Sequence, residues 1–270
     1  MKAIRSISIV VATSFLAGCG QRESASPPSQ ETKPSPSSAP ATPATPSAPD
    51  SPAPSGATGS ATITGKIVFK GTPPKLPMIN FAADAACAAM HPTPVPVESV
   101  VVNADGTLQN VFVYVKEGRD LRRPPPKTPV VLNQAGCMYR PHVLGIQVGQ
   151  PLDILNSDST LHNVHALPNS NAQFNVGQPV AGMKTTKRFT APEIMVKFKC
   201  DVHPWMIAYV GVLDHPYFSV SGTNGTFSIG SLPAGTYLIA AWHEKYGTQE
   251  QSVTVADQET KEISFEFKEP

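Results

Sequence analysis

The chain has 270 residues, of which 40% are hydrophobic and 15% are charged, and its formal net charge is +1. A net charge this small excludes the large basic surface of a nucleic-acid-binding protein and the polybasic patch of a protein that binds anionic membranes. The length is sufficient for one large domain or two small ones with real cores.

Residues 1–19 have the layout of a secretory signal. Lys2 and Arg5 precede an apolar run, residues 7–16, that is too short to cross a bilayer as a helix. The ending LAGC resembles the lipobox of bacterial lipoproteins, which implies cleavage before Cys19 and attachment of lipid to its sulfur. We therefore expect an exported, lipid-anchored protein on the periplasmic side of a bacterial membrane. The alternative is an ordinary signal peptide in which the cysteine has no role.

Residues 20–60 consist almost wholly of Ser, Pro, Ala and Thr. Because they lack the apolar spacing of a helix or a strand, we expect a disordered linker. In an extended form such a linker reaches on the order of 100 Å. It would let a folded head work away from the membrane.

From residue 61 onward, short segments rich in β-branched and aromatic residues alternate with Gly, Asn, Asp and Pro. Helical spacing is confined to a turn at AADAACAAM, residues 82–90. The pattern predicts an all-β protein made of sandwiches.

The cysteines are informative because the expected compartment is oxidising. If Cys19 carries lipid, Cys87, Cys137 and Cys200 remain. We expect a disulfide between Cys87 and Cys137, which would close a loop of about 50 residues and contribute about 4 kcal/mol. Cys200 is then the odd thiol, and a bound metal would protect it.

The segment CDVHPWM places Cys200, His203 and Met206 within seven residues. A mononuclear copper electron-transfer site needs two imidazoles, one thiolate and a weak thioether, and this segment offers one of each. The second imidazole must come from elsewhere, and NSDSTLHNVHAL offers His162 and His165. A zinc site is a weaker interpretation because zinc gains little from a thioether. A buried structural thiol with a core methionine is the other alternative.

Together these segments resemble the cupredoxins, with the His-Asn-Val-His pattern and the short Cys-x-x-His-Pro-aromatic-Met loop of the amicyanin type. The resemblance covers about residues 130–213. It implies a Greek-key β-sandwich with one type 1 copper, bound strongly by His162, Cys200 and His203 and weakly by Met206. His165 lies out of phase on its strand and is expected to face away from the metal.

We also have expectations for the residues around these ligands. Next to Pro204 and Trp205, the ring edge of His203 is expected to meet solvent in an apolar patch, where a redox partner such as a cytochrome c or a periplasmic dehydrogenase would dock. Asn163 is expected to bond across to the loop near Asp201 and to hold the two ligand segments together. Asp201 stands where many cupredoxins have a small hydroxyl residue, and its charge is expected to shift the copper potential or the pH response of that potential.

Residues 214–270, with GTFSIG and LPAGTYLIAAWH, resemble the carboxypeptidase regulatory-like, or prealbumin-like, β-sandwich. Residues 61–118 resemble the first strands of the same module. We therefore expect one small sandwich from these two segments, with a cupredoxin domain at residues 119–213 inserted between them. Methylamine-utilisation proteins of cupredoxin type have a similar order. The alternative is two consecutive domains.

The leading functional hypothesis is a membrane-tethered blue copper protein that carries electrons. Copper delivery or sensing is the first alternative, and a structural or scaffold lipoprotein with a structural copper is the second. Catalysis is not expected, because all four ligand positions are filled and the sequence shows neither an open coordination site nor an acid–base pair.

Overall fold

The structure, a computed structural model, describes residues 59–119 and 121–269. The expected signal segment with Cys19 and nearly all of the expected linker lie outside these residues. The described chain is almost entirely β, as the sequence pattern predicts. None of the helices in these two ranges is long and apolar enough to cross a membrane.

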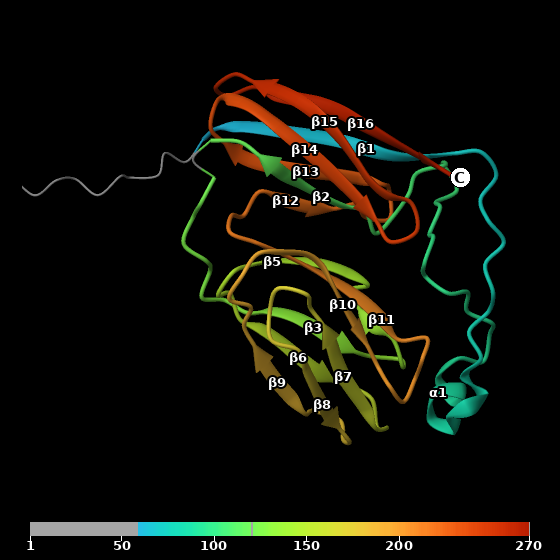
Figure 1. Cartoon of the computed structure of the whole chain (residues 1–270). Coiled ribbons are helices and arrows are strands. Elements are labelled where there is room, and N and C mark those ends of the chain that lie inside the picture. Colours follow the sequence, from blue (N-terminus) through green and yellow to red (C-terminus); the bar gives the residue numbers. More distant parts are fainter. Residues whose placement is uncertain (1–58, 120, 270) are drawn as a thin grey trace, which may run out of the picture. The chain divides into compact units, whose positions relative to one another are not determined.

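One sandwich combines strands from both ends of the described chain, and we call it the split sandwich (Figure 1). One sheet has the order β13-β1-β16 and the other has the order β12-β2-β14-β15. β1 pairs antiparallel with β13 and parallel with β16, so the first strand joins the last part of the chain. Its strands are β1 (Ala61–Lys70), β2 (Phe112–Glu117), β12 (Phe218–Val220), β13 (Thr226–Leu232), β14 (Gly235–His243), β15 (Gly247–Val255) and β16 (Thr260–Lys268).

Between β2 and β12 the chain forms a second sandwich, which we call the inserted sandwich. One sheet has the order β5-β11-β10-β7-β8 and the other has the order β4-β3-β6-β9. Its strands are β3 (Val130–Gln134), β4 (Tyr139–Arg140), β5 (Val143–Gln147), β6 (Leu152–Asn156), β7 (His162–Leu167), β8 (Phe174–Gln178), β9 (Lys184–Lys187), β10 (Glu193–Lys199) and β11 (Ile207–Leu213). β2 pairs with β12 in the split sandwich, and the strands that lie between them in the chain form the sheets of the inserted sandwich. The division into domains at residues 61–118, 119–213 and 214–270 stays a prediction.

Alternating apolar residues build each core. In β1 every second side chain is buried, because successive side chains of a strand point to opposite faces of the sheet. Phe227 and Ile229 alternate along β13, Tyr237 and Ile239 alternate along β14, and all four lie in the core of the split sandwich. A separate buried cluster fills the inserted sandwich.

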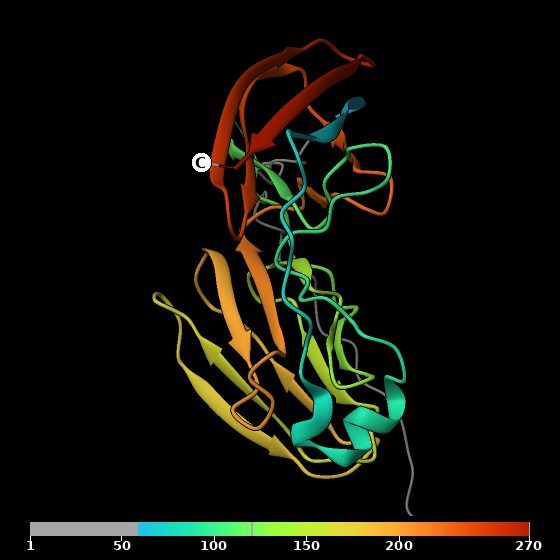
Figure 2. The ribbon, with the colours of Figure 1, turned by 90° about the vertical axis from the view of Figure 1, so that its right-hand side faces the viewer.

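A short helical segment, residues 79–91, packs on the inserted sandwich, and we call it the cap. It contains η1 (Phe81–Ala83) and α1 (Ala85–Met90), which together extend one residue before the helical turn expected at residues 82–90. In Figures 1 and 2, α1 lies at the same end of the inserted sandwich in both views. Phe81 and Cys87 belong to the core of the inserted sandwich. Residues 79–91 thus pack on the inserted sandwich, although they lie within residues 61–118, the segment expected to supply the first strands of the other sandwich.

The cap is fastened covalently. Cys87 of α1 forms a disulfide with Cys137, with their Cα atoms 5.6 Å apart, which is the pairing expected from the sequence. Cys200 is a free, buried cysteine, also as expected. The disulfide fixes α1 beside the segment that joins β3 to β4.

Candidate metal centre

Two strands that share a sheet present the predicted ligands at one place. His162 is the first residue of β7, and Cys200 follows the last residue of β10. β7 and β10 are antiparallel neighbours, with Lys199 opposite His165. Because antiparallel neighbours run in opposite directions, the start of β7 and the end of β10 meet at the same edge of the sheet. The third residue, His203, lies on the loop from β10 to β11.

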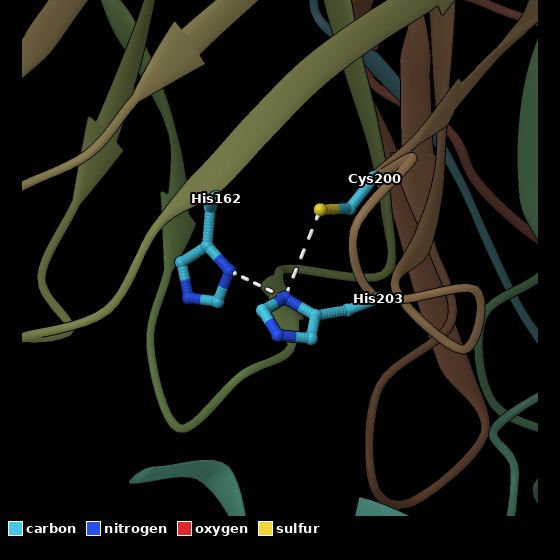
Figure 3. Close-up of side chains that lie close together, drawn as sticks. All are labelled: His162, Cys200 and His203. Atoms are coloured by element: carbon cyan, nitrogen blue, oxygen red, sulfur yellow. Dashed lines mark hydrogen bonds between the residues drawn. The ribbon is translucent and has the colours of Figure 1, made fainter. Parts of the chain in front are cut away.

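The donor atoms of these three residues converge (Figure 3). His162 Nδ1 lies 2.9 Å from His203 Nδ1, and Cys200 Sγ lies 3.8 Å from His203 Nδ1. All three donor atoms lie within 4.8 Å of one another. The side chains are buried, with exposed fractions of 0%, 2% and 1% for His162, Cys200 and His203.

The ligand loop closes on itself through its backbone. The N–H of Cys200 donates to the carbonyl of Met206 at 3.1 Å, and the N–H of Met206 donates to the carbonyl of His203 at 2.9 Å. Met206 is fully buried and belongs to the core of the inserted sandwich. The loop is thus tight, and its methionine lies on the protein interior.

Each imidazole also has a carboxylate on its outer nitrogen. Asp158 Oδ2 lies 2.9 Å from His162 Nε2, and Asp84 Oδ2, from the cap, lies 3.2 Å from His203 Nε2. Sequence reasoning missed both carboxylates. The sequence could have indicated Asp158, because a carboxylate four residues before a ligand histidine is a recognisable pattern. Asp84 was not, because it is 119 residues away from its partner.

These contacts fix the hydrogen positions on the two imidazoles in a way that suits the binding of a cation. A carboxylate only accepts hydrogen bonds, so each neutral imidazole places its hydrogen on Nε2 and leaves Nδ1 bare. With both rings neutral, two bare acceptors face each other at 2.9 Å in a buried site, and this contact is a hydrogen bond only when one ring also carries a hydrogen on Nδ1. The hydrogen of the Cys200 thiol can satisfy one of them, whereas a metal ion between them would accept electron pairs from both and from the thiolate. Two imidazoles and a soft thiolate are a donor set that suits copper.

The charge states follow from burial and hydrogen bonding. Burial lowers the pKa of His162 and outweighs the opposing effect of the Asp158 hydrogen bond, so the ring is neutral at pH 7. The backbone N–H of Cys87 is the main cause that lowers the pKa of Asp84 to about 2, with contributions from Thr160 and His203. Asp84 is therefore a carboxylate at neutral pH.

Asn163 links the two ligand segments, as expected. Its Oδ1 accepts from the backbone N–H of Asp201 at 2.6 Å, and its own backbone N–H donates to Cys200 Sγ at 3.5 Å. Its Nδ2 donates to Asp201 Oδ2 at 3.1 Å. The carboxylate of Asp201 also bonds to Lys199, Asn175 and His165, and these hydrogen bonds, with Lys199 first, hold its pKa far below the ordinary value.

The expectation of a solvent-exposed His203 edge is wrong. The ring is 1% exposed, because the cap covers it with Asp84 and with Cys87, whose Sγ lies 3.7 Å from His203 Nε2. The sequence motif carries no information on which distant segment covers the loop. Pro204 remains exposed, whereas Trp205 is only partly exposed.

Trp205 joins the cap to the ligand loop. Its Nε1 donates to the carbonyl of Cys137 at 2.9 Å, and its ring meets that of Phe81 edge to face with centroids 5.3 Å apart. The ring of His203 lies 5.0 Å from it, centroid to centroid. Trp205 thus fixes the loop against the disulfide as well as bordering the exposed surface.

His165 bonds to groups outside the donor cluster. Its Nδ1 contacts Asp201 Oδ2 at 3.0 Å, and its Nε2 contacts Gln173 Nε2 at 2.6 Å. Both ring nitrogens are therefore engaged on the other face of β7. This agrees with the expectation that His165 faces away from the site.

No protein-family model and no curated protein sequence matches the chain. Among solved structures, the chain is similar to the Cu(I) form of an amicyanin mutant, at 22% identity over 31% of this chain and 81% of that one, with a TM-score of 0.28. It is similar to a purple cupredoxin from Nitrosopumilus maritimus, at 26% identity over 31% of this chain and 97% of that one, with a TM-score of 0.26. A copper-containing nitrite reductase from Thermus scotoductus matches at 23% identity over 37% of this chain and 25% of that one, with a TM-score of 0.28. Since these TM-scores lie below 0.5, we draw nothing about this chain from them.

Proposed function

We propose that the chain is a type 1 copper protein that carries electrons. The observation that supports this proposal is the convergence of His162 Nδ1, Cys200 Sγ and His203 Nδ1 in a buried site whose outer imidazole nitrogens are already held by carboxylates. Met206, buried in the same loop, is the proposed weak fourth ligand. A copper ion bound there supplies a one-electron couple.

The chain's own residues contribute rigidity and the exclusion of water. The loop hydrogen bonds, the Asn163 bridge and the disulfide-fastened cap all hold the donors in one arrangement. A site that changes little between two oxidation states suits electron transfer. Fixed, buried donors disfavour the rapid release that copper delivery requires.

The wider setting is part of the same proposal. Lipid on Cys19 and the linker would tether the folded part on the periplasmic side of a bacterial membrane. A cytochrome c or a periplasmic dehydrogenase would meet it briefly at the surface near Pro204 and Trp205. Such contacts are small and short-lived in electron transfer.

Voltammetry of the copper-loaded protein tests the carrier role. We expect a reversible one-electron couple in the wild type and in His165→Ala, and loss of the couple in Cys200→Ser. Stoichiometric copper binding with rapid exchange and without a reversible couple would contradict the proposal and favour copper delivery.

A further inference from the structure

The carboxylates of Asp158 and Asp84, which contact the two imidazoles, are each surrounded by hydrogen-bond donors. Asp158 accepts from the backbone N–H of Gly136 through Oδ1 and from that of Cys137 through Oδ2, both at 2.8 Å. The third partner of this carboxylate is Nε2 of His162, so every group that the structure places within hydrogen-bond reach of it is a donor. Because Asp158 is only 5% exposed, water replaces few of these bonds.

Asp84 has the same arrangement at the other imidazole. Its Oδ1 accepts from the N–H of Ala86 at 2.8 Å and of Cys87 at 3.1 Å, and its Oδ2 accepts from Thr160 Oγ1 at 3.0 Å. His203 is the remaining donor. An asparagine at this position would turn an NH₂ group toward either the backbone donors or the imidazole, so only a carboxylate satisfies both sides.

The disulfide joins the groups that hold these carboxylates. Cys137 donates its N–H to Asp158, and Cys87 donates its N–H to Asp84. Since Cys87 and Cys137 are bonded to each other, the two carboxylates are fixed on either side of one covalent bridge. Their positions relative to the two imidazoles are therefore set together.

We propose that Asp84 and Asp158 are positioning residues that hold His203 and His162 in the Nε2–H tautomer, with both Nδ1 lone pairs aimed at the metal position. Their negative charges lie on the outer side of both imidazoles and favour the more highly charged Cu(II) over Cu(I), which lowers the reduction potential. The second statement rests on the proposed copper function. The first does not, because it concerns the metal-free rings.

Heteronuclear NMR that detects imidazole nitrogens tests the first statement on the metal-free full chain. In the wild type we expect one tautomer, Nε2–H, for both His162 and His203. Asp84→Asn should abolish this preference at His203 and leave His162 unchanged, and Asp158→Asn should do the reverse. Asp201→Asn is the matched control, because Asp201 contacts neither ring, and it should leave both tautomers unchanged.

The copper-loaded proteins test the second statement. The reduction potential should rise in Asp84→Asn and in Asp158→Asn, and by less in Asp201→Asn, whose carboxylate is exposed and contacts neither imidazole. A Nδ1–H tautomer at either histidine in the wild type overturns the positioning role, and so does an unchanged tautomer at His203 in Asp84→Asn. Equal potentials in all three variants overturn the charge effect. If the tautomers are as expected but copper does not bind, the proposed function fails while the positioning role stands.

Discussion

Removing the disulfide is expected to destabilise the protein strongly. The change is Cys87→Ala together with Cys137→Ala, two residues separated by 50 positions in the sequence and both fully buried. On the chain-entropy model, opening a loop of about 50 residues lowers the free energy of unfolding by about 4 kcal/mol at 25 °C. That is a large part of the stability of a typical domain, which is roughly 5–15 kcal/mol.

Equilibrium unfolding in urea, followed by tryptophan fluorescence, measures this loss. Trp205 lies in the ligand loop and Trp242 lies in β14, so Trp242→Phe leaves a reporter in the inserted sandwich alone. In that background the double alanine variant should lose about 4 kcal/mol. The disulfide-bonded protein treated with a dithiol should lose a similar amount. A loss below about 1 kcal/mol would refute the reasoning, because it would show that the cap and its loop are fixed without the covalent bond.

Three further predictions concern other parts of the molecule. Burial lowers the pKa of His243 to about 4, so the unfolded chain takes up this proton first as the pH falls. The contribution of His243 to the free energy of unfolding should fall by about 3 kcal/mol between pH 6.5 and pH 4, and His243→Phe should reduce the pH dependence measured by urea unfolding by that amount. A Cβ on Gly211 would lie 2.5 Å from the buried ring of Phe112, so Gly211→Ala should lower the free energy of unfolding by about 1–3 kcal/mol. Gly177→Ala is the control: a Cβ there would meet nothing within 4 Å, and the change should be less than about 1 kcal/mol. His165→Ala should leave the visible absorption of the copper-loaded protein unchanged, and its loss would place His165 among the ligands.

The donor cluster and the class of fold were predictable from sequence because both depend on local patterns. Alternating apolar residues set the buried faces of the strands, and the resemblance of LHNVH and CDVHPWM to the cupredoxins implies His162 and Cys200 as ligands, which the structure places on adjacent strand ends. The cysteine count led to Cys87–Cys137 because lipid and metal accounted for the other two. Each of these inferences uses residues close together or a count.

The cap could not be predicted because it depends on a contact between distant segments. The run AADAACAAM indicates a helical turn, yet its few apolar residues do not reveal which sandwich they pack against. Its packing on the inserted sandwich brings Asp84 to His203 and buries the ring edge that the ligand loop alone would leave exposed. The strongest departure from the sequence expectations therefore arises where tertiary packing adds a carboxylate to a site.

A copper titration tests the central claim most directly. One equivalent of Cu(II) per chain should produce the intense visible absorption of a thiolate–copper bond in the wild type, and Cys200→Ser should not produce it. Zinc added in equal amount should not displace the copper. A colourless wild-type protein, or one that binds zinc in preference, would contradict the assignment of His162, Cys200 and His203 as a copper site.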